Sequence, residues 1–379
     1  MDIMRRFFIL TLLAIVVSAC TKTVINEDLL RPDYIPQKER GETIHATIEE
    51  DAQTRVELNA NKQTVWTEGD QIVRYGDNVY DVWTFNGNTG DISGSFSYFG
   101  EWTQKPDYDF SGKYFAFYPY STYSGRGSFS DGSIAVFFYV PAEQTYHYNS
   151  YDPNSNAMLG IGRDQTNFRF KNLMGYLRIS LTGDKRVKSI TLEGNNDEVL
   201  SGLRYISLEN IELTNWYSNE SYSKVINCGN GVQLTDEPTQ FYFSLVPVVF
   251  EKGLSITISF TDGTTYAKST SARVDIARNT IQPMTTIDTN AEVEWQTATL
   301  KHSGERIYAP YVLDASSSYL TFGYVYWGDS VITSLKDVME YYTYDDGKSS
   351  HTVTIETQNA TQLYLSSCAG ISEIDLTNF

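Results

Sequence analysis

Short segments in which apolar and polar residues alternate recur along this chain, and they constrain its fold more than any other feature. Within residues 168–202, Leu177, Ile179 and Leu181 alternate with polar residues, the period of a strand with one buried face. A polar turn follows, and a second β-rich segment covers residues 187–192 before a Gly-Asn-Asn turn. We interpret this pair as an antiparallel hairpin or a crossover near the centre of an all-β domain.

The segments on either side have the same character. Residues 44–48, 114–118 and 254–260 are β-rich, turn signals recur about every ten residues, and helical periodicity is nearly absent. A Gly/Ser-rich stretch, 121–133, is typical of an exposed loop. We predict an N-terminal β-sandwich over 44–165 and a second β-sandwich over 166–292.

Composition excludes one class of partner. The chain has 379 residues, and its formal net charge of −18 argues against nucleic acid, because phosphate contacts need a basic face. Tyrosine is abundant, with 28 residues, which suits the flat faces of strands. The acidity is typical of a protein that stays soluble outside the cell.

The N-terminus predicts the compartment. Arg5 and Arg6 precede an apolar run, 7–17, of the length of a signal-peptide core. The run ends in Val-Ser-Ala before Cys20, which resembles a bacterial lipobox. We predict a signal peptide over 1–19, an acyl (palmitate) anchor on Cys20 and a tether over 20–43. The alternative is an ordinary signal peptide with an incidental cysteine. No later segment has the apolar length of a membrane span, so lipid is the membrane contact we expect.

Catalytic and metal motifs are missing from the sequence. The four histidines are scattered without metal-binding spacing, and no nucleophile elbow or phosphate-binding glycine loop occurs. Cys228 and Cys368 lie far apart, and we expect two free, buried thiols in preference to a disulfide between domains. We therefore expect no enzyme, no cofactor and no metal.

Several segments in the same order carry a family resemblance. They are 54–72 (TR…VWTEGDQI), 170–183 (FKNLMGYLRISLTG), 241–266 and 277–284 (ARNTIQPM). With the lipobox, they resemble Bacteroidales fimbrillin-family lipoproteins over residues 45–285. The resemblance implies tandem transthyretin-like β-sandwiches and a structural, accessory or tip role in adhesive fimbriae. In polymerising members, an Arg-specific protease removes the first strand, and the open groove accepts a strand from the next subunit.

That mechanism suggests two processing positions. Arg55 follows the first predicted strand, 44–50, and is our first candidate for cleavage, with Arg40 as the second. A removed strand would leave unpaired backbone groups beside apolar pockets, which a donor strand satisfies. The alternative is that Arg55 is a solvated turn residue.

The C-terminus departs from the family pattern. Residues 293–359 resemble a small PKD-like β module, in which we expect Trp327 to fill the core and Asp329 to cap a turn. Residues 360–379 resemble one rung of a leucine-rich repeat, which must dock on its neighbour because a lone rung cannot bury a core.

Two functions remain open at this point. The first is a fimbrillin-like lipoprotein of the outer membrane surface and fimbrium, with other subunits and host or microbial surface proteins or glycans as partners. The alternative is a surface lipoprotein that captures polysaccharide on exposed aromatics, with Trp83, Trp102, Tyr120 and Tyr123 as candidates. The competing interpretation of those four residues is core packing.

Overall fold

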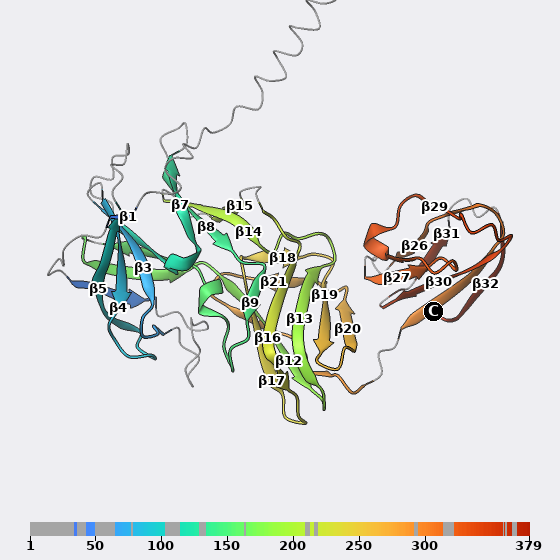
Figure 1. Ribbon diagram of the computed structural model, residues 1–379, viewed down its shortest axis with the longest axis horizontal. Helices are drawn as coiled ribbons and strands as arrows, with labels where there is room; N and C mark the ends of the chain where they lie inside the picture. Colours follow the sequence, from blue (N-terminus) through green and yellow to red (C-terminus); the bar gives the residue numbers. More distant parts are fainter. Residues whose placement is uncertain are drawn as a thin grey trace, which may run out of the picture.

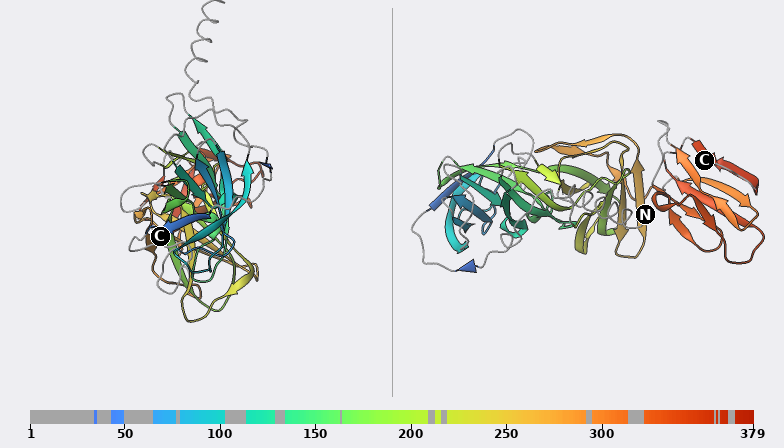
Figure 2. Two further views of the ribbon diagram at one scale, coloured as in Figure 1. Left: turned by 90° about the vertical axis from the view of Figure 1, so that its left-hand side faces the viewer. Right: turned by 90° about the horizontal axis from the view of Figure 1, so that it is seen from above.

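The protein is built from β-strands. The structure, a computed structural model, describes residues 34–35, 43–49, 65–76, 79–102, 114–128, 134–162, 164–208, 213–215, 219–291, 295–313, 322–358, 360, 362–365 and 370–379. In this part of the chain there is no α-helix, and the helical pieces are the short 3₁₀ turns η2 (Tyr120–Thr122), η3 (Pro153–Ser155) and η4 (Leu335–Asp337). The all-β prediction is confirmed. The first sheet, the second sandwich and the C-terminal module follow one another along the long axis (Figures 1 and 2).

The first sheet closes on itself. Its order is β1-β5-β2-β11-β10-β6-β3-β4, and β4 also pairs with β5. Its strands are β1 (Tyr34–Ile35), β2 (Thr43–Ile48), β3 (Gln71–Gly76), β4 (Val79–Phe85), β5 (Ser93–Trp102), β6 (Tyr114–Tyr118), β10 (Met158–Gly162) and β11 (Asn167–Asn172). Apolar side chains, Trp66 and Phe170 among them, fill the space that the closed sheet encloses.

A second layer covers part of this sheet from outside. It consists of β7 (Tyr123–Ser128), β8 (Ile134–Val140), β14 (Gly202–Ser207) and β15 (Leu213–Asn215). A separate apolar cluster that includes Phe117 and Phe138 lies between the layers, so β6 is buried on both faces. The predicted loop 121–133 is therefore wrong in part: β7 pairs with β8, and a register shift between Tyr123 and Gly125 accommodates its glycines.

The second sandwich packs two sheets over the largest apolar cluster. One sheet has the order β20-β19-β13-β16-β9, and the other has β12 between β17 and β22, with β23 also paired to β12. The strands are β9 (Glu143–Thr145), β12 (Gly175–Thr182), β13 (Arg186–Gly194), β16 (Ser223–Gln233), β17 (Thr239–Leu245), β19 (Leu254–Phe260), β20 (Thr265–Thr270), β22 (Ile281–Pro283) and β23 (Ile287–Asp288), beside the small pair β18 (Val248–Phe250) and β21 (Val274–Ile276).

The central stretch connects these two sheets. β12 and β13 lie in different sheets, so of the two predicted arrangements the structure has the crossover and not the hairpin. Strand pairing also crosses the predicted boundary at residue 165, because β11 pairs with β10 and β2, and β9 joins the second sandwich. The division into 44–165 and 166–292 stays a prediction.

The C-terminal module has its own core around Leu300, Val325, Trp327 and Ile355. Its main sheet has the order β28-β27-β30-β24-β32, and two strand pairs complete it. The strands are β24 (Gln296–His302), β25 (Arg306–Tyr308), β26 (Pro310–Leu313), β27 (Gly323–Tyr326), β28 (Ile332–Ser334), β29 (Tyr341–Thr343), β30 (His351–Thr357), β31 (Gln362–Leu365) and β32 (Ile371–Asn378).

The expected roles of two module residues are confirmed. Trp327 is 2% exposed, and Asp329 accepts a hydrogen bond from the Val331 amide at 3.1 Å. The tail segment 360–379 supplies β31 and β32, which pair with β26 and β24. The tail thus docks on its neighbour as strands of this module, and its likeness to a leucine-rich repeat stays a prediction.

Candidate functional site

The first candidate site is the strand β2 and the groove that holds it. Ile44, Ala46 and Ile48 are buried, whereas the residues between them face outward, so the alternation predicted from the sequence is confirmed. The three side chains point into the enclosed core and join the cluster that contains Phe168 and Phe170. Burying an isoleucine contributes about 1.5–3 kcal/mol, so the two isoleucines together contribute about 3–6 kcal/mol.

Backbone pairing engages both edges of β2. It runs antiparallel to β5, with Thr43 opposite Ser97, and parallel to β11, with Ile48 opposite Phe170. The His45 amide donates to the Thr166 carbonyl at 2.7 Å on the β11 side. Because β2 lies between β5 and β11, its removal would open the closed sheet and expose two strand edges beside an apolar channel.

An ion pair fixes the C-terminal end of β2. The Glu49 side chain is 6% exposed; its Oε1 lies 2.5 Å from Nη1 of Arg278 and accepts a hydrogen bond from the Asn172 amide at 2.9 Å. The same Arg278 nitrogen donates to the Asn172 carbonyl at 2.6 Å. Arg278 lies between β21 and β22, so Glu49 joins β2 to the second sandwich.

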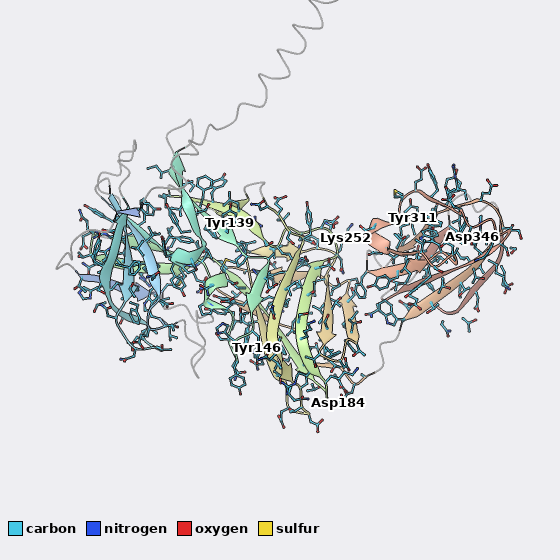
Figure 3. All side chains as sticks on the ribbon, viewed as in Figure 1. Tyr139, Tyr146, Asp184, Lys252, Tyr311 and Asp346 are labelled. Atoms are coloured by element: carbon cyan, nitrogen blue, oxygen red, sulfur yellow. The ribbon has the colours of Figure 1, made fainter. Side chains whose placement is uncertain are left out.

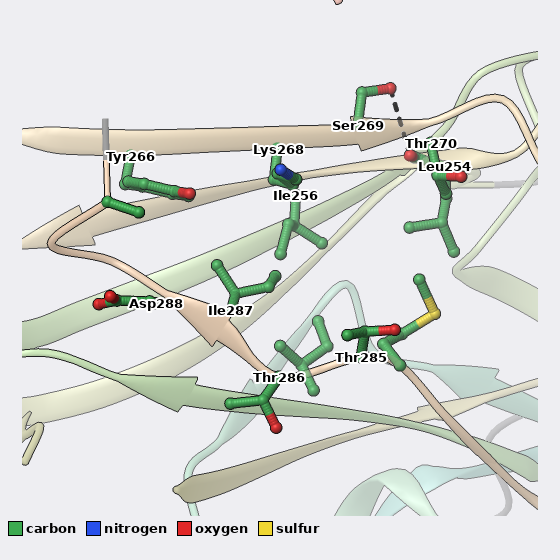
Figure 4. A pocket seen from close by; sticks show the side chains of 13 residues that line it. Leu254, Ile256, Tyr266, Lys268, Ser269, Thr270, Thr285, Thr286, Ile287 and Asp288 are labelled. Carbon is green, nitrogen blue, oxygen red and sulfur yellow. Dashed lines mark hydrogen bonds between the residues drawn. The ribbon is translucent and has the colours of Figure 1, made fainter. Parts of the chain in front are cut away.

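A second candidate site is a cavity of about 390 Å³ at one open side of the second sandwich. It lies between β20 and the segment that contains β22 and β23, and Figure 4 shows Ile256 and Ile287 facing each other across it. Its floor is aliphatic, and Lys268, Thr286 and Asp288 form an exposed polar rim. Lys268 has no ion-pair partner among the described side chains. The sequence showed nothing of this cavity, because its walls come from segments far apart in the chain.

The predicted lipidation and processing residues fall elsewhere. Cys20, Arg40 and Arg55 lie outside the described residues, and Cys368 does too. Cys228 is buried and free, and burial raises the pKa of its thiol to about 12. Such a thiol is unreactive at neutral pH.

The four candidate ligand-facing aromatics do not form a described surface. Trp83 is fully buried, its Nε1 donates to Asp81 at 2.6 Å, and the Arg74 guanidinium lies 4.8 Å from the centre of its ring. It therefore does not face a ligand. Tyr120 and Tyr123 are half-buried and pack against the outer apolar cluster, and the side chain of Trp102 is not described.

Other aromatic residues are exposed, but on separate elements. Tyr139 on β8 is exposed, whereas Tyr311 on β26 is half-buried, and the two lie on different parts of the molecule in Figure 3. Tyr308 and Tyr341 lie opposite each other on β25 and β29, and Arg306 is stacked on the Tyr341 ring at 4.3 Å. The exposed rings are distributed along the molecule as Phe99, Tyr139, Tyr148, Tyr222, Tyr308, Tyr324, Tyr341 and Tyr364.

Several buried polar residues were not identified from the sequence. Arg74 and Asp81 form a buried ion pair at 2.6 Å. Lys224 is fully buried, donates to the Pro141 carbonyl at 2.9 Å, and has its pKa lowered to about 7 by desolvation, against the opposite effect of Asp152. Each of these charges has a partner in the fold, which offsets part of the cost of its burial.

The described part of the chain lacks two further features. Within it, no group of three or more His, Cys, Asp or Glu side chains could hold a metal ion. Nor does this part contain a helix long and apolar enough to cross a membrane.

Comparisons with known proteins give a loose structural likeness. No family model matches the chain, and no curated protein matches it. It is similar to solved structures titled "putative cell adhesion protein" from Bacteroides ovatus (TM-score 0.42, 13% identity, 66% of this chain and 93% of that chain) and Bacteroides uniformis (0.37, 14%, 66% and 93%). It is also similar to a fimbrial protein from Bacteroides vulgatus (0.30, 13%, 66% and 96%). The scores and identities are low, and the likeness says nothing about what this chain binds.

Proposed function

We propose that the protein is a fimbrillin-like, lipid-anchored subunit of the bacterial cell surface, a structural, accessory or tip component of adhesive fimbriae. The observation that carries this proposal is β2. It is a short strand near the start of the chain, it supplies three side chains to a closed core, and it has a paired strand on each side.

This geometry supports strand exchange as the mode of assembly. The stretch after Glu49 contains Arg55, so cleavage there would separate β2 from the rest of the chain. The vacated channel would take an extended donor strand with apolar residues at alternate positions, because the walls keep their unpaired backbone groups. A donor that makes the same contacts regains the burial energy of the two isoleucines, about 3–6 kcal/mol.

The experiment is limited digestion with an Arg-specific protease, followed by sizing in SDS without heating. Cleavage after Arg55 should give a ladder of SDS-resistant oligomers. Arg55→Lys keeps the charge but removes the protease site, and Arg40→Lys is its matched control. Cleavage without oligomers would exclude a polymerising subunit, and an unchanged ladder in Arg55→Lys would exclude Arg55 as the processing site.

A further inference from the structure

The second sandwich has two open sides, and a glutamine side chain closes one of them. Gln144 on β9 is buried at the edge of one sheet and reaches β17 at the edge of the other. Its Nε2 donates to the Tyr242 carbonyl at 2.6 Å, and its Oε1 accepts from the Ser244 amide at 3.1 Å. A carbonyl and an amide two residues apart are the groups that a parallel neighbouring strand would engage. The carboxamide therefore takes the place of such a strand.

The same pattern recurs at the opposite side, but with a glutamine from another module. β20 is the edge strand there, and Gln358 follows β30 of the C-terminal module. Its Nε2 donates to the Ala267 carbonyl at 3.2 Å, and its Oε1 accepts from the Ser269 amide at 3.1 Å. Gln358 is 6% exposed, so this contact is closed to water.

The module holds Gln358 in place. Thr357 is fully buried, and its hydroxyl donates to the Phe322 carbonyl at 2.6 Å. A small cavity of about 60 Å³ beside Phe322 and Tyr324 is also lined by Gly194 and Ser255, so the module meets the sandwich over more than one residue. The contact is a docked surface and not a single bond.

We propose that the C-terminal module is an edge cap, and that Gln358 occupies the edge of β20 through which two copies of the chain would otherwise pair. An uncapped edge strand is a template for pairing with another chain. The sequence of β20, TYAKST, has no proline, and it contains tyrosine and threonines that favour strands. Here the protection comes from another module instead of from the strand itself.

The register favours a second copy as the occupant. The groups of Ala267 and Ser269 that bind Gln358 face outward, so an antiparallel pair of β20 strands can centre on Ala267. That register places Lys268 of one copy opposite Tyr266 of the other, and the two lysines do not meet. An ammonium group beside an aromatic ring is attractive, whereas like charges opposite each other are not. The cavities beneath Tyr266 and Lys268 of both copies would then lie side by side and cover each other's apolar floor.

The test uses the full, uncleaved chain, so it is independent of strand exchange at β2. Gln358→Glu places a carboxylate against the Ala267 carbonyl and should release the cap. Gln362→Glu makes the same change at an exposed position of the same module and is the matched control. Sedimentation equilibrium should show a dimer dissociation constant at least about tenfold lower for Gln358→Glu than for the wild type and the control. Hydrogen exchange of the Ser269 amide should accelerate in the same variant when it is diluted to the monomer, because the paired edge of the dimer would protect this amide again.

A second variant, Ala267→Pro, blocks the pairing of two β20 edges directly. The Ala267 amide faces away from β19, so Ala267→Pro removes a donor that self-pairing needs and keeps the β19 ladder. The double variant Gln358→Glu/Ala267→Pro should return to monomer. A monomeric Gln358→Glu with a rapidly exchanging Ser269 amide would overturn self-pairing. A Ser269 amide that still exchanges slowly in the monomeric double variant would overturn the cap, and a dimer that persists with Ala267→Pro would assign the pairing to another surface.

Discussion

The Glu49–Arg278 ion pair is the most direct test of how β2 is held. Glu49→Gln keeps the shape of the side chain and can still accept from the Asn172 amide, but it removes the charge that Arg278 meets. Hydrogen bonds to charged groups contribute about 1.5–3 kcal/mol, and exposed ion pairs about 0.2–1 kcal/mol. The Glu49 side chain is 6% exposed and that of Arg278 is 42% exposed. We therefore expect Glu49→Gln to lower the free energy of unfolding by about 1–2 kcal/mol.

A double-mutant cycle measures the coupling energy of this pair, from urea unfolding of the wild type, Glu49→Gln, Arg278→Gln and the double variant. We expect a coupling energy of about 1 kcal/mol and amide exchange in β2 faster by about fivefold to thirtyfold, the factors that 1–2 kcal/mol allows. Glu373→Gln is the control, because its ion pair with Lys301 at 2.5 Å is more than half exposed on both sides. A coupling energy of zero, or β2 amides that exchange as in the wild type, would refute the role of this pair in retaining β2.

Three further predictions concern two charged side chains and one backbone position. Lys224→Met should stabilise the protein near pH 7 and lose that advantage toward pH 10. The pKa of Lys224 in the folded wild type is lowered to about 7, so between pH 7 and pH 10 the unfolded chain binds one more proton than the folded chain, and the wild type gains stability as the pH rises. Urea unfolding at pH 7 and at pH 9.5 should show that the stability difference between variant and wild type shrinks by up to about 3 kcal/mol. Asp346 accepts from the Lys348 amide and from His351, which lower its pKa; the stability it provides is present above about pH 4 and is lost on acidification, and Asp346→Asn should flatten this loss in acid melts of the C-terminal module. Gly253→Ala should destabilise by more than 1 kcal/mol in thermal melts, because φ is +76° and a Cβ would lie 1.9 Å from the Thr270 carbonyl oxygen; an unchanged melting temperature would contradict this.

The sequence predicted the strands well where one face is buried. Ile44, Ala46 and Ile48 alternate with outward residues in the sequence and in the fold. Trp83 packs in the core, as the alternative interpretation has it, and the adjacent Val82 is buried as well. A strand covered on both faces has no alternation, so a large aromatic in it cannot be assigned to surface or core from its neighbours.

The pairing partners of each strand could not be predicted from the sequence in the same way. β2 and β11 are more than a hundred residues apart and pair in parallel, which no local pattern encodes. The choice between a hairpin and a crossover for residues 175–194 also depended on which sheet each strand joins. Gln144 and Gln358 are ordinary polar residues in the sequence, and their roles come from backbone groups on β17 and β20.

These features together decide which edge the proposed strand exchange would use. A glutamine carboxamide closes β17 from within the sandwich and another closes β20 from the C-terminal module, so neither edge is available to a donor while the caps stay. β2 differs, because it is a complete strand with its own apolar side chains, and one cut in the chain would separate it from its neighbours. A side-chain cap engages two backbone groups, whereas β2 fills a channel. In the proposed exchange, a donor at β2 would replace one strand by an equivalent strand and would leave no edge unpaired once it is seated.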